Sequence, residues 1–159
     1  MTGKYDRSTK VTWLDGMPGG WRIAFGEQMM EEIATALKGE ELLITQVKEK
    51  FGGLRFYCHG TSREVYNVIS KYERMSYYIC IHCGKPATKI SMGWISPYCD
   101  QCALELNQKL DKDLRVDFVP IEEYYKENKE DMICLEKLQS LDGKPPMLSR
   151  NNLRRMGTK

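Results

Sequence analysis

The chain has 159 residues, of which 42% are hydrophobic, and this is enough for one globular domain with appendages. It has no run of about 18 apolar residues and no secretory leader pattern at its start, so we expect a cytoplasmic protein without membrane association. The formal net charge is +2, but the last sixteen residues carry five basic residues and no acid, and removing those five charges from +2 leaves −3. Bulk charge therefore excludes a broadly basic, nucleic-acid-binding body.

The first twenty residues are polar and rich in glycine, which predicts irregular structure up to Gly20. Apolar residues then recur every four positions, and this spacing predicts a helix over residues 21–38 with Gly39 just past its end as the C-cap. The apolar stripe consists of Trp21, Phe25, Met29, Ile33 and Leu37.

Two strands are predicted next. Residues 42–47 are aliphatic and β-branched, and residues 54–58 alternate between apolar and polar side chains. Gly52 and Gly53 lie between them and reach positive φ at little cost, as a tight reversal requires. We expect an antiparallel hairpin that must pack on helices, because an isolated hairpin is only marginally stable in water.

The rest of the chain predicts mainly helices. Thr61 and Glu64 have the spacing of a capping box, and an apolar stripe follows from Val65 to Ile79. Further patterns predict a helix over 103–114, a strand over 116–119 and a helix starting at Pro120. That last helix would carry Ile121, Tyr124, Tyr125, Met132, Leu135 and Leu138 and end before a flexible basic tail over 143–159.

Four of the six cysteines form two closely spaced pairs. Cys80 and Cys83 make one C-x2-C pair, and Cys99 and Cys102 make another after fifteen intervening residues. This spacing lies within the range of zinc sites, because each short turn directs two sulfurs at one metal and two turns complete a tetrahedron. We predict one structural Zn²⁺, since four protein ligands close the coordination sphere.

The fold class that follows is α+β, a small helical domain with a two-stranded β-hairpin and a four-cysteine zinc finger. A knuckle, a hairpin and a helix that carries the last two ligands describe a treble-clef-like finger, and a zinc ribbon is the alternative. The expected regions are 1–79 for the helix, hairpin and helix, 80–115 for the finger, 116–142 for the C-terminal helix and 143–159 for the tail. Two buried or disulfide-bonded cysteine pairs, or iron in place of zinc, are the other interpretations.

Catalytic patterns are incomplete. A zinc deaminase needs a ligand two residues before a glutamate, which neither His59 nor His82 provides. Metal-dependent nucleases of the treble-clef type need more histidines than these two, so nuclease activity is a less favoured hypothesis. Cys58 and His59 are strand neighbours and should point to opposite faces, and Cys134 is expected to be a core residue. We therefore expect a protein that is not an enzyme.

Positive charges and aromatic rings are interleaved around the predicted reversal at residues Lys48, Lys50, Phe51, Arg55 and Tyr57. Such a mixture can stack on bases or anchor in a protein pocket. The alternative is that Phe51 and Tyr57 belong to the core and the charges form a solvated rim.

The segment 46–57, the following helix, the Cys80–Pro86 knuckle and the later Gly93, Trp94 and Cys99 resemble a family of small uncharacterised phage and prophage proteins. The resemblance covers about residues 21–103. It implies a phage-encoded accessory protein in the bacterial cytoplasm that binds a host macromolecule, foremost a host protein such as a component of a defence system. A nucleic-acid-binding zinc finger is the alternative function.

Overall fold

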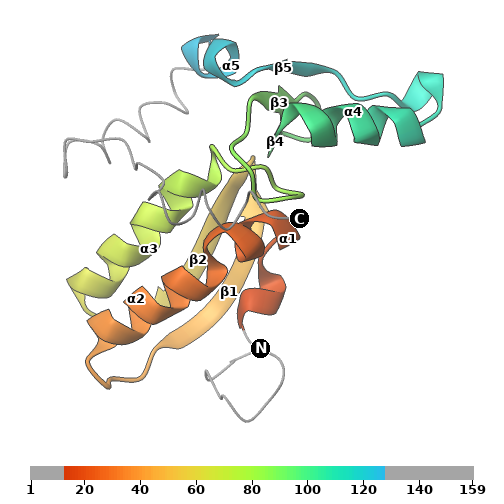
Figure 1. The fold of residues 1–159 in the computed structure, drawn as a ribbon. Helices are drawn as coiled ribbons and strands as arrows, with labels where there is room; N and C mark the ends of the chain where they lie inside the picture. Colours follow the sequence, from red (N-terminus) through yellow and green to blue (C-terminus); the bar gives the residue numbers. More distant parts are fainter. Residues whose placement is uncertain (1–12, 128–159) are drawn as a thin grey trace.

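A computed structural model describes residues 13–127 of the chain. Their fold is mixed helix and sheet, as predicted, in two parts (Figure 1). One part packs helices against a two-stranded sheet, and the other surrounds a three-stranded sheet of order β4-β3-β5.

The first helical segment begins earlier than predicted. A 3₁₀ turn, η1 (Trp13–Gly16), is followed by α1 (Gly19–Trp21), a π-helical turn η2 (Arg22–Gly26) and α2 (Glu27–Leu37). The expectation of irregular structure up to Gly20 is thus wrong for these residues. An α-helix turns once every 3.6 residues, so an apolar repeat of four drifts around it. The wider π turn offsets this drift and keeps the stripe facing the core.

The predicted hairpin is confirmed, with longer strands. β1 (Leu43–Lys50) pairs antiparallel with β2 (Gly53–His59), and a bulge interrupts the register between Ile44 and Gln46. Along β2 the side chains of Leu54, Phe56 and Cys58 are buried, as the alternation predicts. The reversal consists of Phe51 and Gly52, with φ of 51° and 77°.

The outer edge of β2 is covered by polar side chains of α3 (Arg63–Ser76). The N–H of Leu54 donates to Ser76 Oγ at 2.7 Å, and the N–H of Phe56 donates to Glu73 Oε1 at 2.9 Å. Tyr66 Oη donates to the carbonyl oxygen of Cys58 at 3.3 Å. These bonds satisfy backbone groups that an edge strand would otherwise leave open.

The N-cap of α3 differs from the prediction. Ser62, not Thr61, caps the helix, because Ser62 Oγ accepts a hydrogen bond from the N–H of Val65 at 3.4 Å. With Ser62 as the N-cap the N3 position is Val65, so the predicted capping box of Thr61 and Glu64 is wrong.

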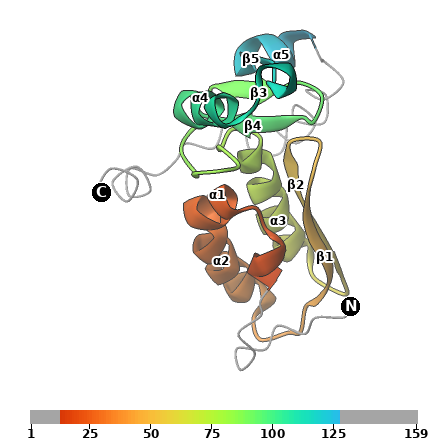
Figure 2. The ribbon, with the colours of Figure 1, turned by 90° about the vertical axis from the view of Figure 1, so that its right-hand side faces the viewer.

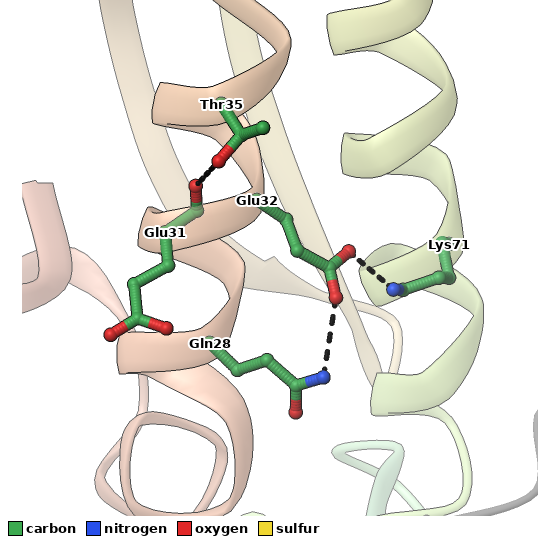
Figure 3. Close-up of polar contacts among 5 residues, drawn as sticks. All are labelled: Gln28, Glu31, Glu32, Thr35 and Lys71. Carbon is green, nitrogen blue, oxygen red and sulfur yellow. Dashed lines mark hydrogen bonds and ion pairs between the residues drawn. The ribbon is translucent and has the colours of Figure 1, made fainter.

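Helices α2 and α3 lie side by side over the hairpin (Figure 2). Glu32 of α2 forms an ion pair with Lys71 of α3 and accepts a hydrogen bond from Gln28 Nε2 at 3.2 Å (Figure 3). On the same helix, Thr35 Oγ1 donates to the carbonyl oxygen of Glu31 at 2.9 Å. The main core lies between these two helices and the hairpin. Its buried residues include Trp21, Phe25, Met29, Ile33, Leu54, Phe56, Val65, Ile69 and Tyr72.

The second part begins after α3. β3 (Lys89–Ser91) and β4 (Ser96–Tyr98) form the hairpin expected between the cysteine pairs, and α4 (Asp100–Lys109) follows directly. A 3₁₀ turn η3 (Lys112–Leu114) leads to β5 (Phe118–Pro120), which pairs with β3, and then to α5 (Ile121–Glu127). A small core of Ile90, Ile121 and Tyr125 unites these elements.

Two predicted boundaries are corrected here. The helix expected over 103–114 ends at Lys109, because Asn107 Oδ1 accepts from the N–H of Val116 at 2.8 Å and Asn107 Nδ2 donates to its carbonyl at 2.9 Å. Pro120 ends β5 and does not begin the last helix. The positions of that helix after residue 127, Met132, Leu135 and Leu138 among them, lie outside the described residues, as do Cys134 and the predicted tail.

Candidate metal centre

The four predicted cysteines come together in the second part of the fold. Cys80 and Cys83 lie in a tight turn after α3, closed by the N–H of Gly84 donating to the Cys80 carbonyl at 3.0 Å. Cys99 is the N-cap of α4, and Cys102 lies in its first turn. All four Sγ atoms lie within 4.8 Å of one another.

This arrangement can hold a metal ion. The sulfur atoms of Cys83 and Cys99 are 3.6 Å apart. Four sulfurs at about 2.3 Å from a tetrahedral metal are separated by about 3.8 Å, so the observed spacing fits such a site. Cys80, Cys99 and Cys102 are buried and Cys83 is half-buried, which leaves the cluster little contact with water.

The protein environment shifts the pKa values of Cys83, Cys99 and Cys102 in different directions. Burial disfavours the Cys99 thiolate, but the N–H of Cys102, which donates to Cys99 Sγ at 3.4 Å, and the neighbouring thiols outweigh it and lower the pKa of Cys99. Burial raises the pKa of Cys83 and of Cys102. Cys99 is thus better prepared to ionise than Cys83 and Cys102, at the N-terminus of a helix that favours negative charge.

His82 lies next to the cluster. Its Nδ1 is 3.6 Å from Cys102 Sγ, although its side chain is exposed on the turn between Cys80 and Cys83. A ring nitrogen at this position can act as a partner of the ligand sulfur outside the coordination sphere.

The turn of the first pair rests directly on α1. Gly20 donates its N–H to the carbonyl oxygen of Ile81 at 2.9 Å, and Trp21 Nε1 donates to the carbonyl of Ile79 at 2.9 Å. A Cβ atom on Gly20 would lie 2.2 Å from the Cys80 carbonyl oxygen. No local pattern marks this role of Gly20, because the contact joins segments that are about 60 residues apart in the sequence.

Tyr77 joins the hairpin to the second part. A Cβ atom on Gly53 would lie 2.5 Å from Tyr77 Cζ, so only glycine leaves room for this ring. Tyr77 also contacts Tyr125 of α5 edge to face, with ring centroids 6.3 Å apart. Its hydroxyl lies 2.6 Å from Arg55 Nη2, which donates to it. Gly53, the first residue of β2, is therefore explained by packing, whereas Gly52 of the reversal is explained by its positive φ.

The structure brings the predicted binding residues onto one face of the hairpin. Lys48 pairs with Arg55 across the strands, and Tyr57 lies on the same outward face, since residues two apart on a strand share a face. Lys48 Nζ lies 5.6 Å from the Tyr57 ring centroid and Lys50 Nζ 5.4 Å from that of Phe51. Phe51 is 71% exposed and Tyr57 42% exposed, so the alternative that both belong to the core is wrong.

The structure also contains a cavity that the sequence did not predict. This cavity has a volume of about 460 Å³ and lies at the open end of the β1–β2 hairpin, against the C-terminal half of α2. Its wall is mainly apolar and includes Trp13, Ile33, Leu37, Leu42 and Ile44, with Glu40, Glu41 and His59 among the polar members. The elements that form it are separated in sequence, and no short motif marks it.

Cys58, His59 and His82, the other residues considered for catalysis, do not come together in the structure. Cys58 is buried and His59 is exposed, on opposite faces of β2, so the two do not form a nucleophile and base pair. The two histidines also lie in different places, His59 in the cavity wall and His82 at the cysteine cluster.

Within residues 13–127, no helix has the length and apolar character of a membrane span.

Comparison with known proteins returned no matching family model, curated protein or solved structure.

Proposed function

We propose that this is a non-catalytic zinc-binding protein in which the metal holds the fold and a surface of the folded protein binds a macromolecular partner. The observation that carries the proposal is the closed set of four cysteine sulfurs within 4.8 Å. Four thiolate ligands suit zinc and leave it no open position for a substrate.

The same geometry supports a treble-clef-like finger over a zinc ribbon. The first two ligands come from a turn, the β3–β4 hairpin follows, and the last two ligands come from the start of α4. In a ribbon, the second pair would lie in a β-turn.

For the partner, a protein of a bacterial host is the first candidate. The resemblance of segment 46–57 and of the cysteine turn to phage proteins suggests a phage-encoded accessory protein, for example an inhibitor of a defence protein. The exposed aromatic side chains of Phe51 and Tyr57 support a protein-binding surface, because aromatic anchors dominate the binding energy of many protein interfaces.

The test uses the full zinc-loaded chain with an affinity tag, mixed with lysates of several bacterial hosts. Native mass measurement of the recovered material should show a complex of fixed stoichiometry. The Cys99→Ser variant, which lacks one ligand, should fail to form it. The absence of any such complex in all hosts would contradict the proposal.

Nucleic-acid binding is the second candidate, favoured by the outward cations Lys48, Lys50 and Arg55 beside aromatic rings. It predicts an affinity for a labelled single strand of about 20 nucleotides that falls steeply with salt and weakens in Lys50→Gln. An affinity that does not change with salt would rule this candidate out.

A plasmid-nicking assay with magnesium or manganese tests the less favoured nuclease hypothesis.

A further inference from the structure

The reversal of the β1–β2 hairpin has an unusual residue at its first position. Phe51 has a φ of 51°, and a bulky side chain rarely occupies this left-handed region, where glycine and asparagine are preferred. Its ring is not used to fill the core, since Phe51 is 71% exposed. A strained, exposed aromatic residue indicates a role outside the fold, because strain of this kind is typical of binding and active sites.

The reversal does not stand alone on the surface. A Cβ atom on Gly52 would lie 3.3 Å from Ile95 Cγ2 and 3.4 Å from the Ile95 carbonyl oxygen. The closed end of the β1–β2 hairpin thus touches the β3–β4 turn, and Figure 2 shows the two close together. That turn presents two further exposed apolar residues, Met92 at 42% and Trp94 at 79% exposure.

The β3–β4 turn is held rigidly. The buried Ser91 Oγ lies 2.6 Å from the carbonyl oxygen of Trp94, to which it donates, and accepts the N–H of Ser96 at 3.0 Å. The N–H of Met92 donates to the carbonyl of Asp117 at 2.8 Å, which ties the turn to the start of β5. A rigid turn presents an exposed tryptophan at a lower entropic cost on binding than a mobile one.

The outward face of the β1–β2 hairpin, beside the first of these turns, is positively charged. Lys48, Lys50 and Arg55 project from the outward face of the hairpin, where the strand pairing places no acid. Glu49 belongs to the opposite face and accepts the N–H of Gly52 at 2.7 Å. The positive charge of this face is local, because residues 13–127 as a whole contain 14 Lys and Arg against 17 Asp and Glu.

We infer that Phe51, Met92 and Trp94 form the centre of one interaction surface, the two-turn surface, and that its partner is a protein with an apolar pocket bordered by acidic side chains. This inference rests on the proposed function and names its surface and partner chemistry. An apolar centre with aromatic and methionine side chains and a charged rim is the anatomy of a protein interface. A rim of three cations complements an acidic partner and speeds its approach.

The cysteine cluster supports this surface without being part of it. Met92 and Trp94 lie between Cys83 and Cys99 in the sequence, so a metal that orders the finger also fixes the β3–β4 turn against the β1–β2 turn. The surface is complete only when both parts of the fold are in place.

A random displayed library of peptides of about 12 residues is the probe, selected on the full zinc-loaded chain. Enriched peptides should combine an aromatic or aliphatic residue with flanking Asp or Glu. A synthetic enriched peptide should bind Phe51→Asn and Trp94→Ala at least about tenfold more weakly than the parent chain. Lys48→Gln combined with Lys50→Gln should weaken binding and flatten its salt dependence.

The control variant is Ile23→Ala, since Ile23 is 72% exposed on the π turn, away from both turns, and should leave peptide affinity unchanged. Asparagine tolerates positive φ, so Phe51→Asn keeps the fold, and a circular dichroism melt verifies this. Peptides without acidic enrichment, or affinities insensitive to Phe51 and Trp94, would overturn the inference while leaving a protein partner possible through another surface. Binding of a single-stranded oligonucleotide with no selected peptide would overturn the choice of a protein partner as well.

Discussion

Gly84 and Gly20 approach so closely that a Cβ atom on Gly84 would lie 2.5 Å from the Gly20 carbonyl oxygen. Gly84 also has a φ of 78°, so this position combines a positive φ with a lack of space. We expect Gly84→Ala to lower the free energy of unfolding by about 3 kcal/mol, from backbone strain of about 1–2 kcal/mol and overpacking of a similar size.

Gly93→Ala is the matched control. Gly93 has a φ of 85°, but a methyl group added there would meet nothing within 4 Å, so only the strain of about 1–2 kcal/mol applies. Urea unfolding of both variants measures the difference. Equal losses would show that the close approach of Gly84 to Gly20 adds no overpacking cost to the strain.

Removal of the metal is the second prediction. The purified chain should contain one zinc by elemental analysis, and a chelator should lower its melting temperature, because a structural site contributes its binding energy to folding. Cys99→Ser should lower the free energy of unfolding by more than about 2 kcal/mol and reduce the zinc content. Cys58→Ala removes a buried thiol of the other core and should retain one zinc per chain. Identical melts with and without chelator would contradict a structural role.

Ser76→Ala tests the bonds that cover the edge of β2. The Ser76 side chain is fully buried and accepts the N–H of Leu54, so alanine leaves a buried donor without its partner. The expected loss is about 1–3 kcal/mol in the free energy of unfolding. Ser70→Ala, on the same helix and half-buried, should cost much less, and a loss as large as that of Ser76→Ala would argue against the edge bond as the cause.

The pH dependence of stability should reveal the ion pair between Glu32 and Lys71. Burial alone would raise the pKa of Glu32, but the hydrogen bond and charge of Lys71 outweigh it and hold this pKa below its ordinary value of 4.5. A lowered pKa gives stability that is present above pH 4.5 and is lost as the pH falls through the pKa of the folded protein. The difference in stability between wild type and Glu32→Gln should therefore shrink below pH 4.5.

This difference should remain below about 1 kcal/mol at neutral pH, because both side chains are partly exposed. Glu31→Gln, one residue earlier on α2, should show no comparable change with pH. A difference for Glu32→Gln that stays constant from about pH 3 to about pH 7 would exclude the ion pair as its source.

Phe51→Asn is expected to stabilise the protein. Asparagine followed by glycine is the preferred pair for a two-residue reversal in which both φ values are positive. The gain should be about 1 kcal/mol, less the lost contact of the Phe51 ring with Lys50. Phe51→Leu retains the strain and should not stabilise. Thermal melts of the two variants decide this, and a destabilised Phe51→Asn would show that the ring supports the fold.

The sequence was most informative where the determining interactions are local. The C-x2-C pairs, the alternation from Leu54 to Cys58 and the stripe from Trp21 to Ile33 each report a contact set by neighbouring residues, and each is confirmed. The errors have two sources. Asn107 ends its helix by pairing with Val116, a contact beyond the helix that helical spacing does not report. Ser62 and Thr61 are adjacent residues that can both cap a helix, and the spacing alone chose the wrong one. The space left by Gly53 for Tyr77 has no local signature either.

The order of the two parts along the chain has a consequence for biosynthesis. The main core draws its buried residues from positions 17–79, so all of them leave the ribosome before the first metal ligand. The surface of α1 that receives the cysteine turn is therefore synthesised first, and the finger emerges next to a platform for its first two ligands. We expect zinc capture to follow the folding of the first core during translation, with β5 joining the small sheet after the finger has emerged.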